Sequence, residues 1–168
     1  EGWTEIDRVP RPVAYGATVS TPEGIVCIGG NNSDSSLVEV SRISYNPTKG
    51  EVAVCALPPL PSPMDNLSAA FTGQEIYVAG GTENGQPCHT FLRLNLANIE
   101  KGWEQLPDFP GAARVQPVLA AGESPNGTRI YLAGGFQPIL NEEETVVPTY
   151  VLGCDPVTFT RQYETVLP

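Results

Sequence analysis

Five polar side chains precede apolar segments of this sequence at similar distances, each 14 to 20 residues before the first glycine of a Gly-Gly pair. The planar guanidinium of arginine binds a carboxylate through two parallel hydrogen bonds, and neutral amide or hydroxyl groups suit sugar hydroxyls. Together they predict a site for a carboxylate-bearing, polyhydroxylated ligand. The candidate substrate-binding residues are Arg11, Tyr15, Asn66, Arg114 and Gln116.

Structural roles for the same residues stay open. Arg114 lies directly before an apolar run, so it could form a salt bridge with Asp108, cap backbone carbonyls, or lie in a solvated loop. The same alternatives stay open for Arg11. Tyr15 and Gln116 could pack or bond to the backbone instead of contacting a ligand.

An internal repeat in the sequence indicates where these residues lie in the fold. Apolar runs end in Gly-Gly pairs that follow one another at spacings of 51 and 54 residues: "GIVCIGG", "EIYVAGG" and "RIYLAGG". Each unit contains four strand-like segments, of which the second ends in the Gly-Gly pair, and the pattern resembles kelch repeats. The first segments are "YGATVST", "NLSAAFT" and "QPVLAAG", and the third are "LVEVSRISYNP", "HTFLRLNL" and "PTYVLGCDP". The fourth are "EVAVCALP", "GWEQLP" and "RQYETVLP". The predicted fold is all-β, a kelch-type β-propeller of three four-stranded blades. The blades are 10–58, 59–107 and 108–168, and residues 1–9 form the outer strand of a preceding blade.

Three blades are half of a six-bladed ring, and an open arc exposes a blade face and strand edges. We therefore expect the chain not to be a stable monomer. The remaining blades would come from another chain, a fragment or a second copy. Trp3 and Trp103 begin outer strands and are expected to pack between blades.

In a propeller, loops before the first strands and after the Gly-Gly pairs surround one mouth of the central channel. Arg11 and Arg114 fall within about one position of each other when three extra residues in the third unit are discounted. Arg114 is expected to lean into this mouth, and Asp65 beside Asn66 belongs to the same rim. Glu142 to Glu144 are expected to form a solvated loop tip.

Composition limits the function classes. The net charge of −10 and a pI near 4.4 disfavour binding to nucleic acid or to an anionic membrane surface. The cysteines, Cys27, Cys55, Cys88 and Cys154, form no C-x-x-C motif, and His89 is the single histidine. We expect no metal, which also argues against a copper radical oxidase.

The segments "RPVAYGATVS…IVCIGG" and "WEQLPDFPGAARVQPVLAA…RIYLAGG" are similar to two blades of the bacterial sialic acid mutarotases (N-acetylneuraminate epimerases). Their order matches the cyclically permuted subfamily. The resemblance implies a cofactor-free exchange between anomers of N-acetylneuraminate, with an arginine holding the sugar carboxylate. It implies a periplasmic or secreted location, and leaves a cytoplasmic one open.

One departure concerns catalysis. The family has a glutamate directly after a Gly-Gly pair and an arginine shortly beyond it, but here Asn31, Thr82 and Phe136 follow the pairs. Glu83 comes one residue late, and the next arginine is Arg93 in the following strand. The catalytic residues are therefore unknown and expected in the missing blades, so this segment alone is expected to be inactive. The alternative is a non-catalytic kelch module that binds a glycan or a protein.

Overall fold

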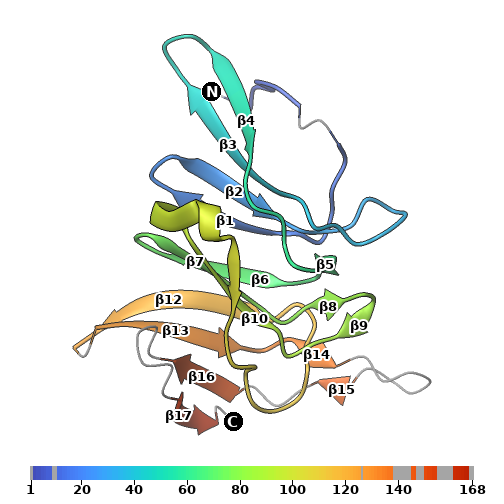
Figure 1. The fold of residues 1–168 in the computed structure, drawn as a ribbon, viewed down its shortest axis with the longest axis vertical. Helices are drawn as coiled ribbons and strands as arrows, with labels where there is room; N and C mark the ends of the chain where they lie inside the picture. The colour runs from blue at the N-terminus through green and yellow to red at the C-terminus, as the bar shows by residue number, and fades with distance from the viewer. Residues whose placement is uncertain are drawn as a thin grey trace.

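In the computed structural model, three antiparallel four-stranded sheets follow one another along the chain. It describes residues 2–8, 11–125, 127–137, 145–146, 150–154 and 161–166. Figure 1 shows the sheets stacked in chain order, with the two ends of the chain at opposite ends of the stack. We call these sheets blades 1, 2 and 3. Each of the predicted ranges 10–58, 59–107 and 108–168 contains one of them.

The strand bounds match the four segments predicted for each unit. Blade 1 contains β1 (Ala17–Thr21), β2 (Gly24–Ile28), β3 (Val40–Asn46) and β4 (Glu51–Ala56). Blade 2 contains β6 (Ser68–Thr72), β7 (Glu75–Ala79), β10 (Phe91–Asn95) and β11 (Trp103–Gln105). Blade 3 contains β12 (Val118–Ser124), β13 (Gly127–Ala133), β16 (Tyr150–Cys154) and β17 (Arg161–Val166).

Short strands lie along one side of the stack, on the right in Figure 1. They follow the Gly-Gly pairs or precede the first strand of a blade, which we call its inner strand (β1, β6 or β12). They are β5 (Met64–Asp65), β8 (Thr82–Glu83), β9 (Gln86–Pro87), β14 (Phe136–Gln137) and β15 (Thr145–Val146). A 3₁₀ helix, η1 (Leu96–Lys101), precedes β11. Within the described ranges, no helix is long and apolar enough to cross a membrane. The prediction for Glu142 to Glu144 lies outside the described residues.

Two apolar clusters hold the blades together. Val26 and Ile28 of blade 1 pack with Ile76 and Val78 of blade 2, and all four are fully buried. The opposite face of blade 2 packs on blade 3 in a second cluster that includes Tyr77. Both faces of blade 2 are therefore buried, because strand side chains alternate between faces.

The second glycine of each Gly-Gly pair lies close to the segment that leads into the first strand of its own blade. A Cβ built on Gly81, whose φ is +90°, would lie 2.4 Å from the Asp65 carbonyl oxygen and 2.7 Å from the Leu67 nitrogen. A Cβ on Gly30, at φ +106°, would lie 2.6 Å from a Val13 methyl group. Only glycine fits such contacts at a positive φ.

The two tryptophans differ in environment. Trp103 packs against the first cluster, and its indole N–H donates to the Pro58 carbonyl at 2.9 Å, linking blades 1 and 2 as predicted. Trp3 is fully exposed, and residues 2–8 form no strand. The expectation that Trp3 packs between blades is wrong for this structure. An outer strand needs a neighbouring strand to bond, and none of the described residues pairs with this segment.

We expect Trp103→Phe to lower the free energy of unfolding by about 1 kcal/mol, because it removes the hydrogen bond to Pro58 and part of the buried ring. Urea unfolding followed by circular dichroism measures the loss. Trp3→Phe is the matched control and should change stability by less than about 0.5 kcal/mol, since the side chain is exposed. Equal losses in the two variants would contradict this assignment.

Candidate functional site

Residues with left-handed backbone conformation precede the inner strand of each blade. Tyr15, Asn66 and Gln116 have φ values of 59°, 52° and 51°. Non-glycine residues rarely adopt this region, and such strain is concentrated at functional sites. The Asn66 N–H donates to the Tyr15 carbonyl at 2.7 Å, and the Gln116 N–H donates to the Asn66 carbonyl at 2.8 Å. We call these three residues the rim row; it runs from blade to blade.

The side chains of the rim row continue this connection. The Gln116 amide donates to Asn66 Oδ1 at 2.9 Å, and Asn66 Nδ2 donates to Asp65 Oδ1 at 2.8 Å. The amide of Asn66 is thus engaged through both its oxygen and its nitrogen. Tyr15 is 64% exposed and Gln116 is also exposed. A phenol and an amide are therefore the rim-row groups that a ligand can reach.

Asp65 is a buried carboxylate beside the rim row. Its Oδ2 accepts from Ser36 Oγ at 2.7 Å and from Asn31 Nδ2 at 3.2 Å, both in blade 1. Its Oδ1 accepts from Thr82 and Asn66 of blade 2. Burial alone would raise the pKa of Asp65, but these four hydrogen bonds favour the charged form and hold the pKa below its usual value. At neutral pH a negative charge therefore lies behind the rim.

Arg114 lies inside the molecule. It is completely buried, and its Nη1 donates to the Gly134 carbonyl at 3.0 Å while its Nε lies 3.5 Å from the Ala112 carbonyl. Its guanidinium carbon lies 5.8 Å from the centre of the Phe109 ring, within cation–π range. The expectation that Arg114 leans into the open mouth is therefore corrected. The charge of Arg114 is stabilised by carbonyl groups and by the face of an aromatic ring. Among the structural roles that the sequence left open, this arrangement corresponds to the capping of backbone carbonyls.

The two arginines occupy different places in the repeat. Gly30 N–H donates to the Met64 carbonyl, and Gly81 N–H donates in the same way to the Arg114 carbonyl, at 2.9 and 2.8 Å. Met64 and Arg114 are therefore equivalent, two residues before the rim row, whereas Arg11 lies four residues before it. The predicted equivalence of Arg11 and Arg114 is off by two positions, and the residue of blade 1 that corresponds to Arg114 is Val13.

Arg11 lies at the edge of a surface groove on blade 1. Its side chain is 73% exposed, and Nη1 lies 3.5 Å from a carboxylate oxygen of Glu39. The groove has a volume of about 390 Å³, and its lining includes Tyr15, Cys27 and Val54. Arg11 and Tyr15 are thus near each other and accessible.

Glu83 does not form the pair expected for catalysis. Its carboxylate accepts from Ser62 Oγ and, at 2.6 Å, from Thr90 Oγ1. Arg93 binds Glu104 instead, at 2.5 Å. Both side chains therefore have structural contacts.

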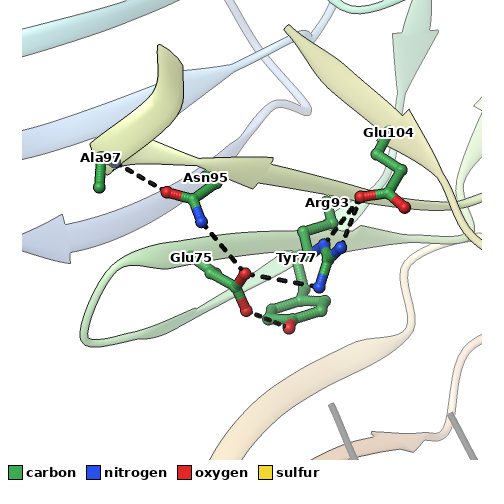
Figure 2. A network of polar contacts seen from close by, with 6 residues as sticks. All are labelled: Glu75, Tyr77, Arg93, Asn95, Ala97 and Glu104. Atoms are coloured by element: carbon green, nitrogen blue, oxygen red, sulfur yellow. Dashed lines mark hydrogen bonds and ion pairs between the residues drawn. The ribbon is translucent and has the colours of Figure 1, made fainter. Parts of the chain in front are cut away.

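The environment of Arg93 is a polar network that joins β7, β10 and β11 (Figure 2). Arg93 also lies 3.5 Å from Glu75, and Glu75 accepts from the hydroxyl of Tyr77 at 2.6 Å and from Asn95 at 3.4 Å. Burial, followed by the neighbouring carboxylate of Glu75, raises the pKa of Tyr77. A neutral phenol with a hydrogen-bond partner indicates a structural role. Among the described side chains, no three metal-ligating residues come together.

Comparison with known proteins agrees with this architecture. No family model matches the chain. It is 29% identical to Kelch-like protein 40 of Xenopus laevis over 147 residues, which are 88% of this chain and 22% of that protein. It is 41% identical to N-acetylneuraminate epimerase of Pasteurella multocida (strain Pm70) over 81 residues, 48% of this chain and 19% of that protein. The chain thus spans about a fifth of each of these relatives.

A solved structure, that of YjhT, covers 98% of this chain with a TM-score of 0.72 and 16% sequence identity, and the match spans 55% of its own chain. The chain is three blades of a kelch-type β-propeller. It resembles the mutarotase family in sequence as well.

Within the propeller, three of the donors around Asp65, from Asn31, Ser36 and Thr82, were not predicted from the sequence. Asn31 and Thr82 directly follow the Gly-Gly pairs, and that shared position was the available signal. For Ser36 there was no such signal in the sequence, because its approach to Asp65 depends on how the loop after the first Gly-Gly pair folds back.

Proposed function

We propose that this chain forms part of the sugar-binding wall of a mutarotase that exchanges the anomers of an acidic sugar such as N-acetylneuraminate. The observation that carries the proposal is the 41% identity to an N-acetylneuraminate epimerase over 81 residues. The rim row adds support, because it aligns accessible hydrogen-bonding groups across neighbouring blades.

The reaction requires both substrate binding and proton transfer. Ring opening needs a base for the anomeric hydroxyl proton and an acid for the ring oxygen, and placed acid–base groups contribute about 10²–10⁴-fold. Asp65 is surrounded by four donors and Glu83 accepts hydrogen bonds from two hydroxyls, so both carboxylates already have partners within the blades. The acid and base would come from further blades, and the chain alone would be inactive. No cofactor enters this scheme.

The wall would recognise a sugar mainly through its hydroxyl and amide groups. Tyr15 and Gln116 offer a phenol and an amide, with Asn66 holding the Gln116 side chain in place. Arg11 is the exposed arginine near Tyr15 and would bind the carboxylate after releasing Glu39. Arg114 would act by positioning the Gly134 turn, because its buried side chain does not reach a ligand.

Exchange NMR tests the proposal by measuring interconversion of N-acetylneuraminate anomers in buffer, with the 168-residue chain, and with the complete propeller that contains it. We expect acceleration only with the complete propeller. A complete propeller that leaves the exchange rate at the buffer value would defeat the mutarotase assignment. A periplasmic or secreted location is part of the same proposal, and cell fractionation checks it.

We expect Gln116→Ala in the complete propeller to raise KM about fivefold, equivalent to one hydrogen bond of about 1 kcal/mol, with little change in kcat. Progress curves of anomer exchange give both constants. Gln105→Ala is the matched control, because Gln105 is exposed on the outer strand β11. A KM that stays at the wild-type value in both variants would remove Gln116 from the binding wall.

A second candidate is a non-catalytic kelch module that binds a glycan or a protein. The match to Kelch-like protein 40 favours it, because that match covers 88% of the chain. Saturation-transfer NMR distinguishes the two functions: a sugar that binds without faster anomer exchange would identify a binding module.

A further inference from the structure

The carboxylate of Asp65 decides which way the side-chain amide of its neighbour Asn66 points. A charged carboxylate only accepts hydrogen bonds, whereas an amide has an accepting oxygen at one end and a donating nitrogen at the other. Asn66 Nδ2 lies 2.8 Å from Asp65 Oδ1. The reversed amide would set its oxygen against a carboxylate oxygen, and two acceptors repel each other. Asp65 therefore keeps the Asn66 oxygen turned away from itself.

This orientation is passed on to Gln116. The Asn66 oxygen accepts from Gln116 Nε2 at 2.9 Å. Gln116 must therefore direct its nitrogen toward Asn66, which leaves Oε1 at the other end of its amide. The side chain is exposed, and no described residue donates to this oxygen. The row of three side chains thus ends in a hydrogen-bond acceptor.

The cluster around Asp65 keeps this carboxylate charged and in place. Its Oδ2 accepts from Ser36 and Asn31 of blade 1, and its Oδ1 accepts from Thr82 of blade 2 besides Asn66. With both oxygens held, the carboxylate cannot rotate away from Asn66. The same bonds hold the pKa of Asp65 below its usual value. All four donors belong to blades 1 and 2, so the cluster is complete without further blades.

The fold itself does not require a charge at this position. Asp65 pairs with Thr82, and the residues at the same place in blade 3, Val115 and Phe136, form the equivalent backbone bridge. Val115 is 4% exposed, so an apolar side chain fills this position and leaves the backbone pairing intact. Replacing a whole buried polar cluster by apolar residues is often neutral for stability. The polar cluster of blade 2 is therefore explained better by its effect on Asn66 than by the fold.

We propose that Asp65 is a positioning residue that makes Gln116 present an acceptor oxygen, so that the sugar group bound there is a hydrogen-bond donor, a hydroxyl or an amide N–H. The inference rests on the proposed function, because it takes Gln116 to face the sugar. A carboxylate has no proton to give to Oε1, and the negative charge of Asp65 behind the rim disfavours it further. An acidic sugar therefore turns its hydroxyl- or amide-bearing side toward Gln116 and leaves its carboxylate to a cation elsewhere, such as Arg11.

NMR of side-chain amides tests the link from Asp65 to Gln116 without any sugar, in the complete propeller labelled with ¹⁵N in asparagine and glutamine. We expect Asp65→Ala to speed the solvent exchange of the Gln116 amide protons about fivefold, the loss of one hydrogen bond. Ser36→Ala is the matched control, because it removes a hydrogen bond from the same carboxylate but keeps the contact with Asn66. It should leave the exchange of Gln116 unchanged. Equal effects of the two variants, or no effect of either, would overturn the proposal.

Asp65→Asn covers the case in which Asp65→Ala does not fold. It keeps the shape of the side chain, but its amide can donate as well as accept, so both orientations of Asn66 become possible. We expect the side-chain amide signals of Gln116 to split into two sets or to broaden. A single sharp set at the wild-type position would show that the charge of Asp65 does not orient this row.

Derivatives of N-acetylneuraminate test the kind of group that Gln116 binds. In each derivative one hydroxyl is replaced by fluorine, or the acetamide nitrogen is methylated, so that one donor is lost and the carboxylate is kept. By calorimetry on the complete propeller, we expect one derivative to bind about fivefold more weakly than N-acetylneuraminate. In Gln116→Ala the same derivative should bind as well as N-acetylneuraminate does, because the two changes remove the same hydrogen bond.

Two outcomes of the calorimetry count against the proposal in different ways. If the loss for every derivative adds in full to that of Gln116→Ala, Gln116 Oε1 accepts from no sugar donor, and the assignment of the bound group is overturned. If N-acetylneuraminate does not bind at all, the proposed function fails and this assignment fails with it. The amide exchange would still decide whether Asp65 orients Gln116.

Discussion

Arg114→Ala is expected to lower the free energy of unfolding by about 4 kcal/mol, the largest effect of any single substitution considered for this chain. The side chain is completely buried, bonds to the Gly134 carbonyl at 3.0 Å and lies over the Phe109 ring. Truncation leaves both a cavity and a carbonyl without its donor. In a domain of this size the midpoint of thermal unfolding should fall by about 10 °C.

Two further variants separate the sources of this loss. Arg114→Met keeps most of the side-chain volume and removes only the charged hydrogen bonds, so it should cost about 2 kcal/mol. Arg11→Ala removes an exposed arginine whose ion pair with Glu39 spans 3.5 Å, and should cost less than about 0.5 kcal/mol. Urea unfolding at one fixed protein concentration gives all three values. Similar small losses for Arg11→Ala and Arg114→Ala would show that the burial of Arg114 contributes little.

Sugar binding provides an independent readout for Arg114. If its role is to position the Gly134 turn, the affinity of folded Arg114→Ala for N-acetylneuraminate, measured well below its unfolding midpoint, should stay within about threefold of wild type. A large loss of affinity with unchanged stability would return Arg114 to direct contact with the sugar carboxylate.

The repeat made most of the fold predictable. Which segments form strands depends on the local alternation of apolar and polar residues and on the turn residues between the strands. Both patterns recur in each unit together with the Gly-Gly pair. The bounds of β3, β10 and β16 therefore fall inside the segments predicted as third strands. Tyr15 and Asn66 could be aligned for the same reason, because no insertion separates either from its glycine pair.

What could not be predicted depends on contacts between distant segments. Arg11 and Arg114 both precede an inner strand, but only Arg114 meets a carbonyl and an aromatic ring that can accept its charge. Counting residues back from the glycine pair with three residues discounted aligns the two arginines, but the rim row shows that the insertion in the third unit is four residues long. Trp3 and Trp103 likewise share a local pattern, and only Trp103 has a neighbouring blade to pack on.

Asp65→Ala is the second large expected effect, a loss of about 3 kcal/mol in the free energy of unfolding. The carboxylate gathers donors from Asn31, Ser36, Asn66 and Thr82, and an unpaired buried donor costs about 1–3 kcal/mol. After the substitution, water can reach only some of these donor groups. The loss in the free energy of unfolding therefore exceeds that of one hydrogen bond. Asp65→Asn keeps the shape and one acceptor oxygen, and should cost about 2 kcal/mol.

The same carboxylate should give the stability a recognisable pH dependence. The folded pKa of Asp65 is held below its usual value, so as pH falls the unfolded chain takes up the proton first. The contribution of Asp65 is therefore complete above about pH 4 and is lost as pH falls through the lower folded pKa. Asp65→Asn should match wild type more closely at each step below pH 4. Asp34→Asn is the matched control, at an exposed position in the loop that also holds Asn31 and Ser36, and should change stability by less than about 0.5 kcal/mol. A difference in the free energy of unfolding between Asp65→Asn and wild type that stays constant down to strongly acidic pH would contradict this. It would mean that Asp65 contributes through its shape and not its charge, and that a charged carboxylate does not join blades 1 and 2.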